Sequence, residues 1–168
     1  GGKLLLGWEP EPDEIKEVPE PAKAALDPKE IRTTEQLYLT GLHLEQYRHA
    51  TYSATDYYEE ALRRDPGDVR NNNAMGLWLI RKGQFAKAEP YLRRAVKTLT
   101  ERNPNPYDGE PLYNLGLSLK YQGKTEEAYD YFYKACWNAA WQDAGYYSLA
   151  QLSAAKGNWE DALYEIDK

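Results

Sequence analysis

The sequence predicts an all-α fold, a solenoid in which antiparallel helix pairs stack one after another. The first observation is a repeated spacing: a small residue is followed at +12, +16 and +19 by alanine, a large apolar residue and alanine. Residues three and four apart share one helix face, so the last three positions mark the packed face of a second helix. The second observation is a glycine at +7, which would end the first helix in the left-handed conformation. The copies are Gly76, Gly83, Ala88, Leu92, Ala95; Gly116, Gly123, Ala128, Phe132, Ala135; Ala150, Gly157, Ala162, Ile166; and Gly41, Ala54, Tyr58, Ala61 with one extra turn residue.

The small first residue of each copy is expected to let the second helix pack closely against the first. These anchor residues, Gly41, Gly76, Gly116 and Ala150, are 35, 40 and 34 residues apart. A period of about 34 residues with this pattern resembles the tetratricopeptide repeat (TPR), which also fits Pro66 after the second helix. The resemblance covers about residues 29–168 and implies a right-handed solenoid of about three and a half repeats. We expect repeats at 33–67, 68–106, 108–141 and 142–168, the last one truncated.

Residues 1–30 are expected to form an irregular extension that is acidic and rich in proline. Prolines at positions 10, 12, 19, 21 and 28 exclude a long helix there. Within it, the stretch KLLLGW at 3–8 predicts a short strand or an apolar plug. One interpretation is a linker leaving an upstream domain. The other is that Leu4, Leu5, Leu6 and Trp8 cover the first repeat, since terminal repeats expose an apolar face.

Both histidines of the chain, His43 and His49, fall in the first repeat. Their spacing of six lacks the i,i+4 pattern of helical zinc sites, and no cysteine pair compensates. His49 stands where the other copies have the turn glycine, and histidine is enriched among non-glycine residues at positive φ. Ser53 and Asp56 then resemble a capping box that opens the second helix. We expect the N-terminal extension to pack against His43.

The second repeat predicts a long second helix, because the stretch AKAEPYLRRAVKTLTERN runs past the usual length. The loop from Asn103 to Gly109 follows, and its Asn-Pro and Asp-Gly pairs predict a rigid turn. This loop either only connects two repeats or folds Asn105, Tyr107 and Asp108 over the mouth of a groove.

The stretch ACWNAAWQDAGYY in the next connection places Trp137 and Trp141 beside amides and a carboxylate. That composition is typical of sugar sites. The repeat register, however, places both tryptophans at the turn between repeats, where packing is the usual role. The fourth repeat stops inside its second helix, so we expect the parent protein to continue.

The first helices of such an array line its concave side, and their repeated positions predict a binding groove. The chain has 15 tyrosines against 2 phenylalanines, and rings with hydroxyl tips suit peptide backbones or sugar faces. Some of these tyrosines are alternatively expected only to pack between helices. The predicted groove residues are Tyr38, Glu45, Asn73, Arg81, Tyr113, Lys120, Tyr121, Tyr147 and Gln151.

Composition excludes several functional classes. The net charge is −6, and residues 8–30 alone hold eight acids and three bases, so the array is close to neutral and no nucleic-acid surface is expected. No apolar run approaches the roughly 20 residues of a membrane span. Cys136 is the single cysteine, so no internal disulfide can form. Without a catalytic motif, metal set or cofactor motif, we expect a non-catalytic chain.

The strings LYLTGLHLEQYRHATYSATDYYEEALRRDPGDVRNNNAMG and NPNPYDGEPLYNLG are similar to a narrower group. Its members are large bacterial proteins of unknown function that join a TPR array to β-rich domains resembling sugar mutarotases. The resemblance implies no defined activity but suggests a carbohydrate-related role for the whole protein. Our leading hypothesis is a scaffold module that holds a protein or peptide partner, or those β-rich domains, in its groove. The alternative is a glycan-recognition part of a carbohydrate-processing enzyme, which would bind an oligosaccharide. A cytoplasmic location is expected unless a targeting segment has been removed.

Overall fold

The computed structural model describes residues 2–11, 18, 20–21, 23–47 and 50–168. These residues contain eight α-helices, two short 3-10 helices and no β-strand. The α-helices are α1 Thr34–Gln46, α2 Ala54–Arg64, α3 Val69–Arg81, α4 Phe85–Thr100, α5 Glu110–Lys120, α6 Thr125–Ala135, α7 Gln142–Ala155 and α8 Trp159–Ile166. The 3-10 helices are η1 Pro28–Glu30 and η2 Ala139–Trp141.

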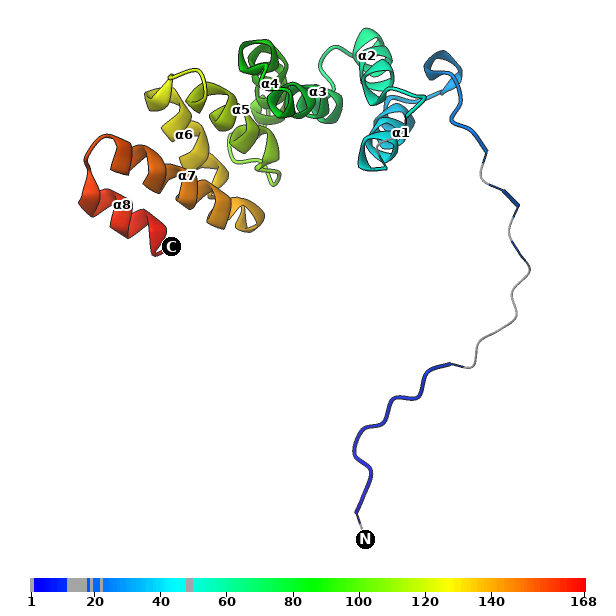
Figure 1. Cartoon of the computed structure of the whole chain (residues 1–168), viewed down its shortest axis with the longest axis horizontal. Helices are drawn as coiled ribbons and strands as arrows, with labels where there is room; N and C mark the ends of the chain where they lie inside the picture. The colour runs from blue at the N-terminus through cyan, green and yellow to red at the C-terminus, as the bar shows by residue number, and fades with distance from the viewer. Residues whose placement is uncertain (1, 12–17, 19, 22, 48–49) are drawn as a thin grey trace.

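The helices form four consecutive pairs that follow an arc (Figure 1). The first helices α1, α3, α5 and α7 lie along the inside of the arc, and α2, α4 and α6 lie along its outside. Each first helix packs mainly on the second helix of its own pair and, from α3 onward, on the helix that precedes it. This arrangement confirms the predicted all-α solenoid.

The anchor glycines lie where two helices of a pair come closest. A Cβ atom added to Gly41 would stand 2.5 Å from the Tyr58 ring, and one added to Gly76 would stand 2.5 Å from Leu92. At Gly116 the distance to the Phe132 ring would be 2.7 Å. Each glycine therefore faces the large apolar residue of its own copy, as the repeated spacing predicts, and these large side chains are fully buried.

The three predicted turn glycines adopt the left-handed conformation. Their φ angles are 70° at Gly83, 77° at Gly123 and 81° at Gly157, a region that L side chains rarely enter. The fourth copy departs from the pattern in its second helix. Ile166 is exposed, and the neighbouring Glu165 is the buried residue. The Glu165 carboxylate accepts a hydrogen bond of 2.6 Å from the Tyr129 hydroxyl.

The predicted capping box at the start of α2 does not form. Ser53 is the N-cap residue, but its hydroxyl lies 2.7 Å from the Thr55 hydroxyl instead of accepting from the helix backbone. The Asp56 amide donates to the Ser53 carbonyl oxygen over 3.3 Å. The predicted turn role of His49 lies outside the described residues.

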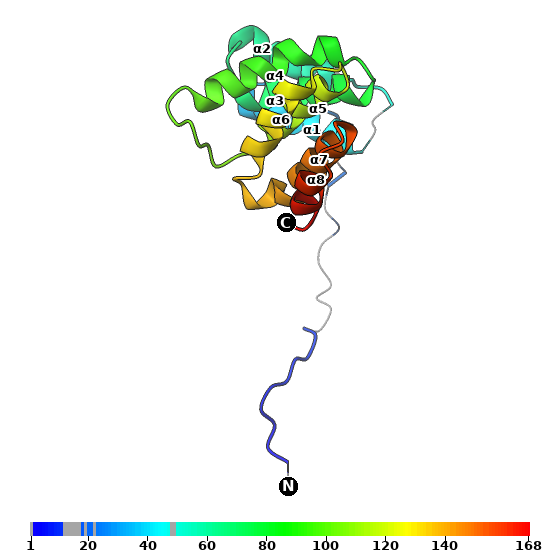
Figure 2. The ribbon, with the colours of Figure 1, turned by 90° about the vertical axis from the view of Figure 1, so that its left-hand side faces the viewer.

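The apolar stretch at 3–8 forms neither a strand nor a plug, because Leu4, Leu5, Leu6 and Trp8 are all exposed. These residues lie away from the helices in both ribbon views (Figures 1 and 2). His43 is also exposed, and the ring that it contacts is Tyr47, with 4.5 Å between centroids. The expected packing of the extension against His43 is therefore wrong.

The part of the extension that packs on the array is the segment around η1, and it packs on α2. Ile31 is buried in the core of the first helix pair, and the Tyr57 hydroxyl donates to the Leu26 carbonyl oxygen over 3.0 Å. Arg64 donates from Nη1 to the carbonyl of Ile31 over 2.6 Å and from Nη2 to that of Pro28 over 3.1 Å. A guanidinium supplies the donors that the end of a 3-10 helix lacks.

The predicted long second helix is α4, which runs for 16 residues and ends at Thr100. The connection from α4 to α5 then projects from the side of the array (Figure 2). Asn103 and Asp108 each accept a hydrogen bond from the backbone amide two residues later. These side-chain turns give the connection the local order that its Asn and Asp residues predict.

Candidate functional site

All nine predicted groove residues lie on the first helices or at their ends. Eight belong to α1, α3, α5 and α7, and Tyr121 is the C-cap residue of α5. We call the surface that these four helices present to the inside of the arc the inner face. Four contacts between side chains cross it from one first helix to the next, and they join Glu35 to Arg70, Glu45 to Arg81, Asn73 to Asn114, and Lys120 to Gln151.

The middle of the inner face is an amide pair. Asn114 Nδ2 donates to Asn73 Oδ1 over 2.9 Å, and both side chains are more than nine-tenths buried. Neither the Asn73 Nδ2 group nor Asn114 Oδ1 has a hydrogen-bond partner among the described residues, and neither atom is sealed from solvent. The two amides therefore hold each other in position. The Asn73 Nδ2 group can still donate a hydrogen bond to a ligand, and Asn114 Oδ1 can still accept one.

A charged cluster lies beside this pair at the N-terminal ends of α1, α3 and α5. Arg70 pairs with Glu35 over 3.3 Å and stands 5.3 Å from the centre of the Tyr38 ring. Burial raises the pKa of Tyr38, and the carboxylates of Glu110 and Asp108 raise it further, against the opposing effect of Arg70. Both carboxylates therefore lie close enough to Tyr38 for their charge to reach its hydroxyl.

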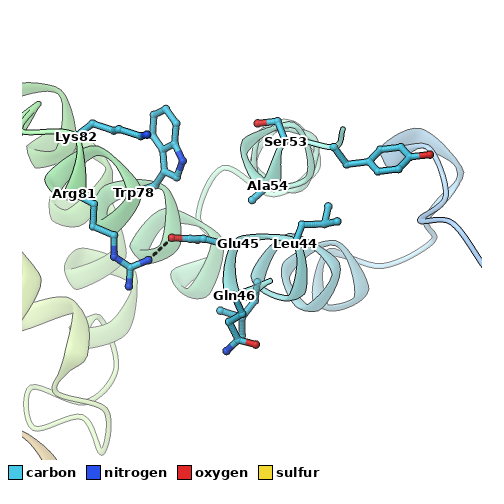
Figure 3. A pocket seen from close by; sticks show the side chains of 10 residues that line it. Leu44, Glu45, Gln46, Ser53, Ala54, Trp78, Arg81 and Lys82 are labelled. Atoms are coloured by element: carbon cyan, nitrogen blue, oxygen red, sulfur yellow. Dashed lines mark hydrogen bonds and ion pairs between the residues drawn. The ribbon is translucent and has the colours of Figure 1, made fainter. Parts of the chain in front are cut away.

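The C-terminal ends of α1 and α3 border a pocket of about 750 Å³ (Figure 3). Figure 3 shows Glu45 and Arg81 pointing toward each other across it and joined by an ion pair. Glu45 also accepts a hydrogen bond of 3.0 Å from the Tyr58 hydroxyl, and burial together with this carboxylate raises the pKa of Tyr58. On the far wall, the Lys82 ammonium lies 5.5 Å from the centre of the Trp78 ring.

Two predicted groove tyrosines also stack on other aromatic rings. Tyr113 stacks on Trp141 at 4.9 Å between ring centroids and also contacts the buried Phe132 ring. Tyr121 stacks on Phe85 at 4.8 Å, at the start of α4. Both Tyr121 and Tyr147 nevertheless keep more than half of their surface exposed, at 58% and 55%.

The loop from Asn103 to Gly109 leans toward the next repeat junction. Asn138 Nδ2 donates to the Tyr107 carbonyl oxygen, and a Cβ atom on Gly109 would stand 3.0 Å from the Trp141 ring. The Tyr107 side chain is 94% exposed, so it does not cover any groove. Trp141 therefore packs at the junction, whereas Trp137 is half-exposed with the Lys134 ammonium 4.9 Å from its ring centre.

Sequence reasoning missed Glu35, Arg70, Glu110 and Asn114, although a signal for three of them was present. Glu35, Arg70 and Glu110 each lie six residues before the anchor glycine of their copy. Residues at one repeat position stack from helix to helix, which explains the Glu35–Arg70 ion pair. Asn114 gave no such signal, because it lies two residues before its anchor glycine whereas Asn73 lies three before its own. The contact between them is evident only in the folded structure.

The described residues contain no group of three or more histidine, cysteine or acidic residues placed to hold a metal ion. Cys136 is buried, and burial raises the pKa of its thiol to about 11. Among the described residues, no helix is long and apolar enough to cross a membrane.

The comparisons with known proteins agree with this architecture. The family model for the tetratricopeptide repeat matches residues 69–136, which span α3 to α6. Among solved structures, MamA from Desulfovibrio magneticus RS-1, from residue 41 to its end, superposes with a TM-score of 0.65 at 20% identity, over 80% of this chain and 72% of that one.

Two further structures show the same likeness. MamA AMB-1 gives a TM-score of 0.65 at 21% identity, over 84% of this chain and 79% of that one. Pseudomonas aeruginosa PilF gives 0.69 at 20% identity, over 80% of this chain and 59% of that one. At these identities the likeness establishes the fold, an all-α TPR solenoid.

Proposed function

We propose that this chain is a protein-interaction module that holds an extended peptide segment along its inner face. The observation that carries the proposal is the Asn73–Asn114 pair, with its free amide donor and free amide acceptor. A peptide group has one N–H to donate and one C=O to accept, so one such group can satisfy both amides at once. Because burial fixes the two amides before binding, little side-chain entropy is lost when a peptide docks.

Two further inner-face contacts extend the surface along the arc. Beyond the amide pair in one direction lies the Glu45–Arg81 ion pair, and in the other lies the contact between Lys120 and Gln151. Burial lowers the pKa of Lys120, which marks a partly desolvated ammonium group. The segment held there belongs either to another protein or to a β-rich domain of the same polypeptide.

We propose that the module itself is non-catalytic. A nucleophilic cysteine needs a lowered thiol pKa, whereas burial gives Cys136 a raised one. The metal-ligand geometry that hydrolytic sites use is absent from the described residues. The function therefore rests on binding.

Glycan recognition is the alternative function, and its support is the exposed ring of Tyr147. Sugar binding on an aromatic ring needs an open ring face. Arg70 stands over Tyr38, Trp141 stacks on Tyr113, and Lys134 lies over Trp137. Because each contact covers one ring face, fewer open faces remain for a sugar, and this favours the peptide hypothesis.

The test is selection of a random twelve-residue display library on the protein, followed by fluorescence anisotropy of the selected peptides. We expect Asn114→Ala to weaken their binding about tenfold, because the hydrogen bond from the peptide N–H to Asn114 Oδ1 is lost and the Asn73 amide loses the partner that holds it in position. Asn158→Ala is the matched control, since it removes an exposed amide at the start of α8. Equal affinity for the wild-type protein and both variants would contradict the proposal.

The same protein is then titrated with plant and bacterial oligosaccharides while amide chemical shifts are followed by NMR. The peptide proposal expects no saturable shift at millimolar sugar. Saturable shifts around Tyr147 would instead support glycan recognition.

A further inference from the structure

The N-terminal extension carries a run of large apolar side chains on which nothing packs. These side chains, each between 83% and 90% exposed, are Leu4, Leu5, Leu6 and Trp8. Single exposed apolar residues are ordinary at a protein surface, but four within five positions form a continuous apolar segment that indicates an interaction. We call residues 3–9 the arm. Both ribbon views place the arm away from the helices of its own chain (Figures 1 and 2), so another molecule can reach it.

A groove on the outer side of the array offers a matching apolar surface. Its walls are the outer helices α2 and α4, and residues of α3 line it between them. Met75, Trp78 and Leu79 of α3 form an apolar floor, to which Pro90 and Tyr91 of α4 add. Its volume of about 560 Å³ lies within the range of roughly 300–1,000 Å³ that is usual for binding pockets. We call it the outer groove.

A proline in α4 leaves a backbone acceptor at this groove. Pro90 lies inside the helix and has no N–H, so the carbonyl oxygen of Ala86, four residues earlier, lacks its usual helical donor. Ala86 and Pro90 both line the outer groove. The arm forms neither helix nor strand, so its backbone N–H groups are available to donate to such an acceptor.

The charges at the ends of the arm complement those on the two walls of the groove. Lys3 and Glu9 flank the apolar run of the arm, whereas Glu59 stands on the α2 wall and Lys87 on the α4 wall. All four side chains are exposed, and none forms an ion pair with a described residue. Seven extended residues span roughly 20 Å, against about 8–10 Å between the axes of packed helices. One arm can therefore place Lys3 beside Glu59 and Glu9 beside Lys87.

We propose that the outer groove of one copy of this chain binds the arm of a second copy. The leucines and Trp8 cover the apolar floor, and the two ion pairs at the rim fix the direction of the arm. Because each copy has one arm and one groove, a reciprocal exchange fills both grooves and closes a two-fold dimer. The outer groove is separate from the inner face, so this inference goes beyond the proposed peptide function and does not depend on it.

Sedimentation velocity of the whole chain over a wide range of concentrations measures the dimer. We expect Leu5→Asp to raise its dissociation constant at least about tenfold, because a carboxylate would have to be buried on the apolar floor. Leu5 is 88% exposed, so the variant stays folded. Leu163→Asp is the matched control, because it changes an exposed leucine on α8 that lies outside the groove, and it should leave the dimer unchanged.

Charge reversal tests the direction of the arm. Glu59→Lys should weaken the dimer about fivefold, because it brings two ammonium groups together. Adding Lys3→Glu to that variant should restore the affinity, whereas Glu160→Lys on α8 should have no effect. In an NMR dilution series, the backbone amides of Thr55 and Lys87 should shift with concentration.

Three outcomes would overturn the proposal. The first is a chain that stays monomeric at every concentration. The second is a dimer that Leu163→Asp dissociates and Leu5→Asp leaves intact, which would place the interface on α8. The third is a monomer in which Leu5→Asp shifts the groove amides, because the arm would then occupy the groove of its own chain.

Discussion

At the scale of single residues, the fold depends on glycines that have no room for a methyl group. Gly41, Gly76 and Gly116 each face a fully buried ring or branched side chain at less than 3 Å from an added Cβ atom. Helix propensity alone would make alanine better than glycine at these positions by about 1 kcal/mol. Close packing acts in the opposite direction, because overfilling a core costs about 1–3 kcal/mol.

An added Cβ at 2.7 Å from the Phe132 ring places the packing cost of Gly116→Ala in the upper part of that range. After the propensity gain is subtracted, we expect the free energy of unfolding to fall by about 1–2 kcal/mol. Urea denaturation followed by circular dichroism measures it. Phe132→Leu in the same chain should recover part of the loss, because the smaller side chain leaves space for the methyl group. Gly2→Ala, where nothing lies within 4 Å, is the control. An unchanged or raised stability of Gly116→Ala would contradict the packing argument.

At the scale of elements, one arginine makes most of the hydrogen bonds that attach the segment around η1 to the array. Arg64 donates to the carbonyl oxygens of Pro28, Lys29, Ile31 and Arg32, and Glu60 holds its guanidinium with a hydrogen bond of 2.7 Å. Hydrogen bonds from Arg63 and Arg64 lower the pKa of Glu60 to about 2. Glu60 therefore stays ionised at neutral pH and keeps Arg64 in place.

Arg64→Met should release this segment while leaving the helices folded, because methionine keeps the apolar stem and loses every donor. The backbone amides of Lys29 and Glu30, which bond to Asp27, should exchange with solvent about tenfold faster. Hydrogen-exchange mass spectrometry of the peptide covering 26–32 is the measurement. Arg63→Met is the matched control, since Arg63 also pairs with Glu60 but has no bond to the segment. Equal exchange in both variants would show that Arg64 does not anchor it.

At the scale of the whole molecule, the core is divided into two clusters. One cluster joins α1 and α2 with Ile31 and the middle of α3, and the other runs from Leu79 to Leu152. Tyr91 on α4 packs against both. In a solenoid each pair contacts mainly its neighbours, so the stability of one end depends on such junction residues.

Tyr91→Ala should weaken the coupling between the two clusters. We expect a loss of about 2 kcal/mol in unfolding free energy, below the range for a fully buried aromatic residue, and faster hydrogen exchange in α1 and α2 than in α5 and α6. Tyr131→Ala is the comparison, because Tyr131 packs against the second cluster. If Tyr91→Ala destabilises all helices equally, the array unfolds as one cooperative unit and the junction has no special role.

The candidate site was predictable only in part. The helices that carry it follow from the repeat period, and Glu45, Arg81, Lys120 and Gln151 lie in cross-helix contacts on the inner face. The stacking of Tyr113 on Trp141 could not be predicted, because Trp141 belongs to the next repeat junction and the two rings meet only in the folded array. Asn114 was missed, because its partner is 41 residues away.

The sequence by itself determined the repeat, the helix pairs and the positions of the turns. These features arise from contacts within about 20 residues, where a fixed spacing on one helix face translates directly into packing. The tertiary structure alone decided which distant side chains meet. It brings Asn73 to Asn114 and Arg64 to the segment around η1, and it leaves Asp108 and Glu110 without an ion pair among the described residues. Those outcomes depend on how successive pairs rotate against each other, because that rotation sets which distant polar atoms reach hydrogen-bonding distance.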